Sequence, residues 1–145
     1  MLANISHLIT PEIYELIYHM GHLDELVIAD ANYKASAMSQ KTVYSGAQSS
    51  HTLLAEILKY FPLDVDEEFP VTVMSLDYGI YEEPQVWQDY QEVLSAASPS
   101  PVILNKVSRK EFYQRTKQAY ATIQTADPRV MADIIIKKGF VFETE

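Results

Sequence analysis

A short apolar run, Leu26 to Ala29, most constrains how this chain can fold. Consecutive apolar residues of this kind are typical of a strand buried on both faces, and such a strand needs covering layers above and below it. Apolar residues at helical spacing precede the run as far as Met20, and Gly21 easily adopts the left-handed conformation that ends many helices. We therefore predict a helix that stops at Gly21 and a buried strand followed by Asp30. Open α/β sheets place ligand-handling groups at this end of a strand.

The rest of the chain alternates helical segments with short apolar strands. Helices are predicted over residues 11–20, 52–61 and 84–97, and from 108 to between 116 and 119; strands are predicted over 71–76, 102–104 and 133–136. Residues 120–124 fit either an extension of the preceding helix or a strand. Residues 31–50 are predicted to form a long loop over the carboxyl edge of the sheet. The acidic residues 64–68 are predicted to form a solvated loop rather than a cation site. The pattern predicts a single α/β domain over residues 1–145, a layered and mostly parallel sheet with helices on both faces.

Composition limits the functions that are open to the chain. Twenty acidic residues against 11 basic ones give a net charge of −9, which argues against nucleic acid as a partner. No apolar run approaches the roughly 20 residues of a membrane span, and the N-terminus lacks the pattern of a signal peptide. Without cysteine there is no disulfide framework and no thiol nucleophile, so a cytoplasmic location is expected. Ten tyrosines suit sugar sites or subunit interfaces.

The sequence lacks the motifs of several common chemistries. It has no Gly-rich phosphate loop, no Gly-x-Ser-x-Gly nucleophile turn and no dinucleotide fingerprint. His19 and His22 are three positions apart, but the predicted helix ends between them and no further ligand pattern follows, so we expect no metal site. What remains is acid/base chemistry without a cofactor, or binding alone.

Three polar residues are the main candidates for such chemistry. His22 carries an imidazole, the commonest general acid or base near neutral pH, although its place beside Asp24 also fits a surface histidine. Asp30 could cap a turn or accept hydrogen bonds from two sugar hydroxyls. Arg109 follows the predicted helix cap Ser108, where a cation opposes the helix dipole. It is either a tolerated surface arginine or a ligand contact.

Several segments, in the same order, resemble the ribose-pyranase and fucose-mutarotase family. These are Met1-Leu2, Ile5-Ser6, Leu8 to Glu12, Met20 to Asp30, Phe112 to Arg115 and Ile135 to Gly139. The resemblance covers nearly the whole chain. Its most specific part is the segment from 20 to 30, in which a glycine, a histidine and two acids surround the buried strand. Arg109, three positions before Phe112, resembles the fucose branch of the family more than the ribose branch.

The resemblance implies an activity, an assembly and a set of site residues. Members of this family are cofactor-free isomerases that speed the interconversion of sugar anomers, and L-fucose is the favoured substrate here. They form ring-shaped homo-oligomers, decamers in known members, with sites near subunit boundaries. By position, His22 would be the catalytic acid/base, and Asp30 and Arg109 would bind sugar hydroxyls.

One departure from the family pattern bears on the choice of sugar. The family has a Tyr-x-Asn element before the last strand, and this chain has Met131-Ala132-Asp133. Met131 and Asp133 remain candidate substrate contacts, and Asp133 is also a candidate for proton transfer. Tyr120 or a tyrosine of a neighbouring subunit would replace the tyrosine ring that is missing at position 131. The alternatives are a D-ribose pyranase, a mutarotase of another monosaccharide, a sugar-binding accessory of a transport system, or a purely structural ring protein.

Overall fold

The computed structural model of the protein describes residues 1–66, 69–76 and 82–143, and within them a six-stranded mixed sheet forms the centre. The strands are β1 (Glu25–Ala29), β2 (Thr42–Tyr44), β3 (Val71–Met74), β4 (Asn105–Val107), β5 (Ala121–Gln124) and β6 (Ile134–Lys137), in the spatial order β2-β5-β1-β6-β3-β4. The pairs β1/β5, β2/β5 and β3/β4 are parallel, whereas β6 runs antiparallel to both β1 and β3. The prediction of a layered, mostly parallel α/β sheet is confirmed.

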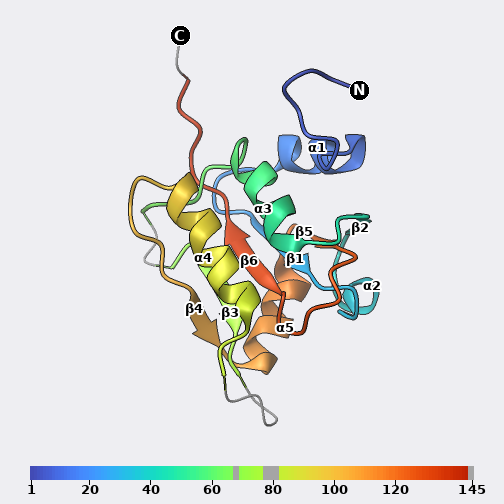
Figure 1. Ribbon diagram of the computed structural model, residues 1–145, viewed down its shortest axis with the longest axis vertical. Coiled ribbons are helices and arrows are strands. Elements are labelled where there is room, and N and C mark those ends of the chain that lie inside the picture. The colour runs from blue at the N-terminus through green and yellow to red at the C-terminus, as the bar shows by residue number, and fades with distance from the viewer. Residues whose placement is uncertain (67–68, 77–81, 144–145) are drawn as a thin grey trace.

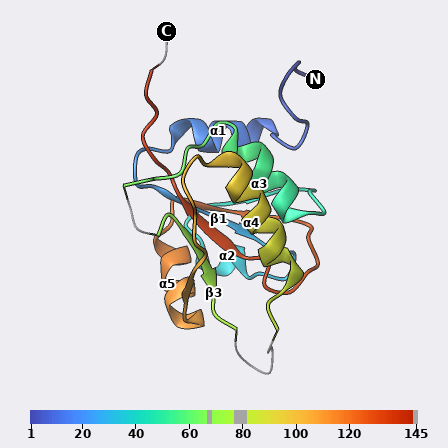
Figure 2. The ribbon, with the colours of Figure 1, turned by 60° about the vertical axis from the view of Figure 1, so that its left-hand side comes forward.

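Helices cover both faces of this sheet. They are α1 (Pro11–His19), α2 (Ala35–Met38), α3 (Ser50–Leu58), α4 (Gln85–Ala97) and α5 (Arg109–Gln118). Helices α3 and α4 lie side by side on one face, and α5 lies on the other (Figures 1 and 2). Helix α1 lies at the end of the molecule toward which the chain runs after β6 (Figure 1). No helix in the described ranges is long and apolar enough to cross a bilayer.

The central strands are buried as their sequence predicts. All residues from Leu26 to Ala29 in β1 have no solvent exposure, and residues 134–136 of β6 are at most 1% exposed. The helix caps are also confirmed. The side chain of Thr10 accepts a hydrogen bond from the backbone N–H of Ile13 at 3.3 Å, and Ser108 caps α5 through the N–H of Glu111 at 3.1 Å. Local sequence signals and tertiary packing therefore agree over most of the core.

The end of α1 differs from the prediction. The helix ends at His19, and Met20 follows it in an extended conformation with φ −69° and ψ 136°. Gly21 does not adopt the left-handed conformation, whereas Leu23 does, with φ 74°. The backbone N–H of Gly21 donates instead to Oδ2 of Asp24 at 2.7 Å. A side-chain acceptor thus closes the turn in place of a left-handed glycine.

Two further predictions were wrong in detail. The predicted loop 31–50 contains α2 and the short strand β2, which is held by parallel pairing with β5 rather than by a pattern of its own. The predicted strand 102–104 is not one, because Ile103 is 65% exposed and the strand β4 begins at Asn105. Pairing with β3 selects these more polar residues at the edge of the sheet. Residues 121–124, for which two structures were open, form β5.

Candidate functional site

A pocket of about 330 Å³ opens at the edge of the sheet where β1 and β3 end. Residues from four separate segments line it: Asp30 after β1, Met74 at the end of β3, Arg109 in the first turn of α5, and Met131 and Asp133 before β6. The parallel strands β1, β3 and β4 all end at this edge, and the antiparallel β6 begins there. Topology alone therefore brings these distant positions together, as the prediction for Asp30 required.

Two aspartates meet at the bottom of this pocket. The backbone N–H of Asp30 donates a hydrogen bond to Oδ1 of Asp133 at 2.9 Å, and Oδ1 of Asp30 accepts from the N–H of Asn32 at 2.7 Å. Asp30 therefore does cap a turn, and it lines the pocket at the same time. Burial, followed by the adjacent carboxyl of Asp30, raises the pKa of Asp133 well above its ordinary value. The surroundings of Asp133 therefore disfavour its charged form.

Helix α4 fixes the backbone just before Asp133. The hydroxyl of Tyr90 donates to the carbonyl of Ala132 at 2.8 Å, and Nε1 of Trp87 donates to the carbonyl of Met131 at 3.2 Å. Met131 has φ 66°, a left-handed conformation that costs about 1–3 kcal/mol in a residue other than glycine. These buried hydrogen bonds hold the strained turn in one position, and with it the carboxyl group of Asp133.

A second buried carboxylate, Asp127, lies in the same loop but has the opposite electrostatic setting. Arg129 donates to both of its oxygens, with Nε to Oδ1 at 3.0 Å and Nη2 to Oδ2 at 2.9 Å. Ser50 adds a backbone and a hydroxyl hydrogen bond to Oδ2. Burial opposes the ionisation of Asp127, but these donors outweigh it and hold its pKa below the ordinary value. Asp127 is thus a paired anion, whereas no cation among the described residues forms an ion pair with Asp133.

Cationic and aromatic groups form the outer wall of the pocket. Lys34 and Arg109 both line it, and Nζ of Lys34 lies 5.0 Å from the centre of the Tyr113 ring. The hydroxyl of Tyr33 lies 2.6 Å from Oγ1 of Thr116, which anchors that ring on α5. The pocket therefore combines anionic hydrogen-bond acceptors and cationic donors with an aromatic wall, which suits a small polyhydroxylated ligand.

His22 lies at the opposite edge of the sheet, before β1 begins. Its Nε2 is 3.4 Å from Oδ1 of Asp64, and its ring centre is 5.5 Å from that of Phe140. The His22 side chain is 39% exposed, whereas that of Asp64 is 3% exposed. The backbone N–H of Asp64 donates to the carbonyl of Lys137 at 3.0 Å, which ties it to the end of β6. An imidazole on the surface is thus oriented by a buried carboxyl group.

Sequence reasoning missed Asp64, which it placed in a solvated acidic loop. The prediction was wrong for this residue, because the isolated bridge between Leu63 and Lys138 pulls it onto the sheet. Val65 and Asp66 are exposed as expected, while residues 67 and 68 of the predicted loop lie outside the described ranges. The only local signal is the apolar Leu63 beside it.

The six predicted site residues therefore fall into two groups within the chain. Arg109, Met131 and Asp133 join Asp30 in the pocket. Tyr120 lies with His22 at the other edge, where its backbone N–H donates to the carbonyl of Glu25 at 2.9 Å. The five residues of β1 separate the two edges, roughly 16 Å at the rise of an extended strand.

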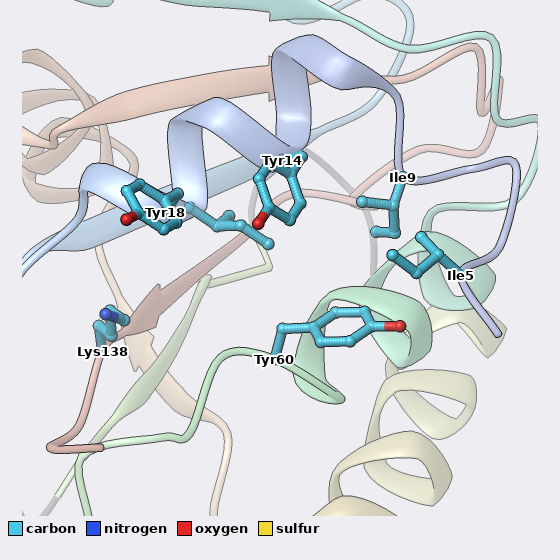
Figure 3. Close-up of a pocket in the computed structure, with 7 residues that line it drawn as sticks. Ile5, Ile9, Tyr14, Tyr18, Tyr60 and Lys138 are labelled. Atoms are coloured by element: carbon cyan, nitrogen blue, oxygen red, sulfur yellow. The ribbon is translucent and has the colours of Figure 1, made fainter. Parts of the chain in front are cut away.

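An exposed aromatic surface surrounds the His22 edge. A second pocket, of about 280 Å³, is lined by Ile5, Ile9, Tyr14, Ile17, Tyr18, Tyr60 and Lys138 (Figure 3). Tyr14 and Tyr18 from α1 are 51% and 71% exposed, and Phe140 and Phe142 are 59% and 77% exposed. Exposed aromatic groups at this density mark interaction surfaces. Among the residues that the structure describes, His, Asp and Glu form no cluster of three or more that could hold a metal ion.

Comparison with known proteins places this geometry in a family. Residues 3–141 match the RbsD / FucU transport protein family. The chain belongs to this family. The resemblance found in the sequence is confirmed. The L-fucose mutarotase of Histophilus somni (strain 2336) is 35% identical over 139 residues, which are 96% of both chains.

Solved structures of the RbsD / FucU family share the fold over nearly the full length. The fucose mutarotase of Streptococcus pneumoniae, in complex with L-fucose, has a TM-score of 0.91 and 31% identity, covering 97% of this chain and all of that one. The protein FucU from Bifidobacterium longum has a TM-score of 0.89 and 30% identity, covering 95% of this chain and 99% of that one. The fold of this chain therefore matches that of fucose mutarotase structures.

Proposed function

We propose that this chain is an L-fucose mutarotase that interconverts the α and β anomers without a cofactor. The observation that carries the proposal is the pocket at the sheet edge, where Asp30, Asp133 and Arg109 converge in a chain 35% identical to the Histophilus somni enzyme. The carboxyl groups and the guanidinium can hydrogen-bond the hydroxyls of one sugar face. Met74 and Val130 give the same pocket apolar contacts for a deoxy or methyl position.

The reaction needs two balanced proton transfers. One group protonates the ring oxygen as the bond from the anomeric carbon to that oxygen breaks, while another group removes the proton of the anomeric hydroxyl. The free aldehyde rotates about its bond to the next carbon and recloses on its other face, and both protons return. A positioned acid/base group contributes about 10² to 10⁴ in rate, which suits a reaction that already proceeds in water. We assign one of these transfers to His22, oriented by Asp64, and hydroxyl binding to Asp30 and Arg109.

His22 reaches the sugar from a neighbouring subunit in this proposal. Within its own subunit the length of β1 separates it from Asp30, so one chain cannot supply both halves of the site. The exposed aromatic side chains beside His22 suit a subunit interface, and a closed ring with identical contacts would pair each imidazole with the next pocket. We propose a ring-shaped homo-oligomer, a decamer, and a role for Tyr120 at the same boundary.

Saturation-transfer NMR across a panel of sugars tests the activity. The protein should speed exchange between the two anomers of L-fucose more than those of D-ribose or D-glucose, and chelators should leave the rate unchanged. If it speeds exchange of D-ribose alone, the pyranase alternative replaces the proposal. If it speeds no exchange at all, the enzyme assignment is wrong.

A second candidate function is sugar binding without turnover, as an accessory of a transport system. The description of the family as one of transport proteins favours it. Isothermal titration calorimetry and saturation-transfer NMR together separate the two candidates, because an accessory binds the sugar in calorimetry while the anomer exchange rate in NMR stays at its value in water.

A further inference from the structure

Asp133 is a buried acid in the pocket to which the proposed reaction assigns no proton transfer. It is 5% exposed, it lines the pocket, and its Oδ1 is held by the backbone N–H of Asp30 at 2.9 Å. The turn that carries it is fixed by Tyr90 and Trp87 through the carbonyls on its N-terminal side. A side chain held this firmly in a ligand pocket has the positional accuracy that proton transfer requires.

We propose that the carboxyl group of Asp133 is the proton donor to the ring oxygen, so that Asp133 and His22 form the acid/base pair of the reaction. This inference rests on the proposed mutarotase function. In the opening step the O–H bond of Asp133 breaks as its proton passes to the ring oxygen, whose bond to the anomeric carbon breaks with the electron pair staying on oxygen. Neutral His22 of the neighbouring subunit takes the proton of the anomeric hydroxyl. Closure reverses every transfer, and nothing is oxidised.

The surroundings of Asp133 favour the protonated form that a donor needs. The groups that face it or share its pocket are Asp30 at the end of β1, Asp127 in its own loop, Tyr33 and Tyr90, and Lys34 and Arg109 on the pocket wall. Burial and the charges of Asp30 and Asp127 raise the pKa of Asp133. Arg129 is paired with Asp127, so its guanidinium group stabilises the Asp127 carboxylate rather than that of Asp133.

The comparison between Asp127 and Asp133 argues for a function. Both carboxyl groups are buried in one loop, but only Asp127 has charged and hydroxyl donors that stabilise the anion. Asp133 accepts from one backbone N–H instead. A buried carboxyl group without a cationic partner costs stability, and such a cost is typical of active sites.

Asp133→Asn is the sharpest variant, because the amide keeps the Oδ1 acceptor for Asp30 and nearly the same shape, while its NH2 group has no acidic proton to transfer. Asp66→Asn is the matched control on an exposed aspartate. Calorimetry with L-fucose should give affinities within a few-fold of wild type for both. Saturation-transfer NMR should show an exchange rate lower by about 10² to 10⁴ in Asp133→Asn alone. The wild-type rate should fall as the pH rises through the pKa of Asp133, and the variant should lose this decline.

Two measurements overturn the inference. ¹³C NMR of labelled aspartate carboxyls, assigned with the variant, should show Asp133 protonated at pH 7 without any sugar, and an ionised Asp133 would contradict the donor role. An Asp133→Asn variant with the rate and pH profile of wild type would do the same while leaving the mutarotase function intact. A wild-type protein that exchanges no sugar removes the proposed function, and the donor role with it.

Discussion

The backbone N–H of Asp30 donates a 2.9 Å hydrogen bond to Oδ1 of Asp133, joining the end of β1 to the start of β6. The contact brings two carboxyl groups together in one pocket, and each of them also accepts a hydrogen bond from a backbone N–H group. Asp30 caps the turn at Asn32, and Asp133 receives the end of β1. The repulsion between the two carboxyl groups raises the pKa of Asp133, which affects the stability of the protein as well as the proposed catalysis.

The pKa of Asp133 predicts a pH-dependent effect of Asp133→Asn on stability. Its folded-state pKa is raised by burial and by Asp30, so the folded protein binds more protons than the unfolded chain between the ordinary and the raised value. The free energy of unfolding therefore falls as the pH rises through that window. The variant lacks this loss, and its melting temperature should exceed that of wild type by a margin that grows from pH 4 to pH 8. A margin that shrinks with rising pH would contradict the raised pKa.

Tyr90→Phe should destabilise the turn that carries Asp133. The phenol hydroxyl is buried and hydrogen-bonds both Oγ of Ser50 and the carbonyl of Ala132, so its removal leaves an unpaired carbonyl in the core. We expect a loss of about 1–3 kcal/mol in the free energy of unfolding by urea denaturation. The matched control Tyr18→Phe removes an exposed hydroxyl and should change stability by less than about 0.5 kcal/mol. Equal effects of the two would place Tyr90 outside the support of the turn.

Arg109→Ala should weaken sugar binding without unfolding the protein. The loss of charge-assisted hydrogen bonds to sugar hydroxyls should raise the Kd of L-fucose by roughly 10- to 100-fold in calorimetry. Lys110→Ala removes a cation from the next, exposed position of α5 and serves as the control. Comparable Kd values for the two variants would remove Arg109 from the binding site.

His22→Ala should lower the anomer exchange rate by about 10² to 10⁴ while His7→Ala, at an exposed histidine, leaves it unchanged. Asp64→Asn should give a smaller loss of roughly 10- to 100-fold, since it removes one charge-assisted contact that orients the imidazole. Saturation-transfer NMR measures all three rates. An unchanged rate in His22→Ala would move the chemistry elsewhere in the pocket.

The core and one edge of the site were predictable because local and tertiary preferences agree there. The buried run of β1 shows in the sequence as consecutive apolar residues, and Asp30 follows from its place after that run. Arg109 was recognisable because a cation at a helix N-terminus is unusual. Each of these signals lies within a few residues of the chain.

The parts that were missed depend on contacts between distant segments. Strand β2 has only three residues and is held by β5, while Asp64 is buried by the bridge from Leu63 to Lys138. The raised pKa of Asp133 follows from its burial and from its contact with Asp30, more than 100 positions away. No local pattern encodes these pairings, because they depend on the order of strands in the sheet.

Subunit complementation tests whether the sugar site is shared between protomers. His22→Ala and Arg109→Ala proteins are mixed in equal amounts, dissociated and reassembled, and exchange is measured at a sugar concentration far below the Kd of Arg109→Ala, where each variant alone is nearly inactive. With His22 and Arg109 supplied by adjacent subunits, random assembly restores both groups in roughly a quarter of the sites, so anomer exchange returns to about a quarter of the wild-type rate. If both groups acted within one subunit, every site would carry one defect. Exchange that stays at the level of the separate variants would contradict the account.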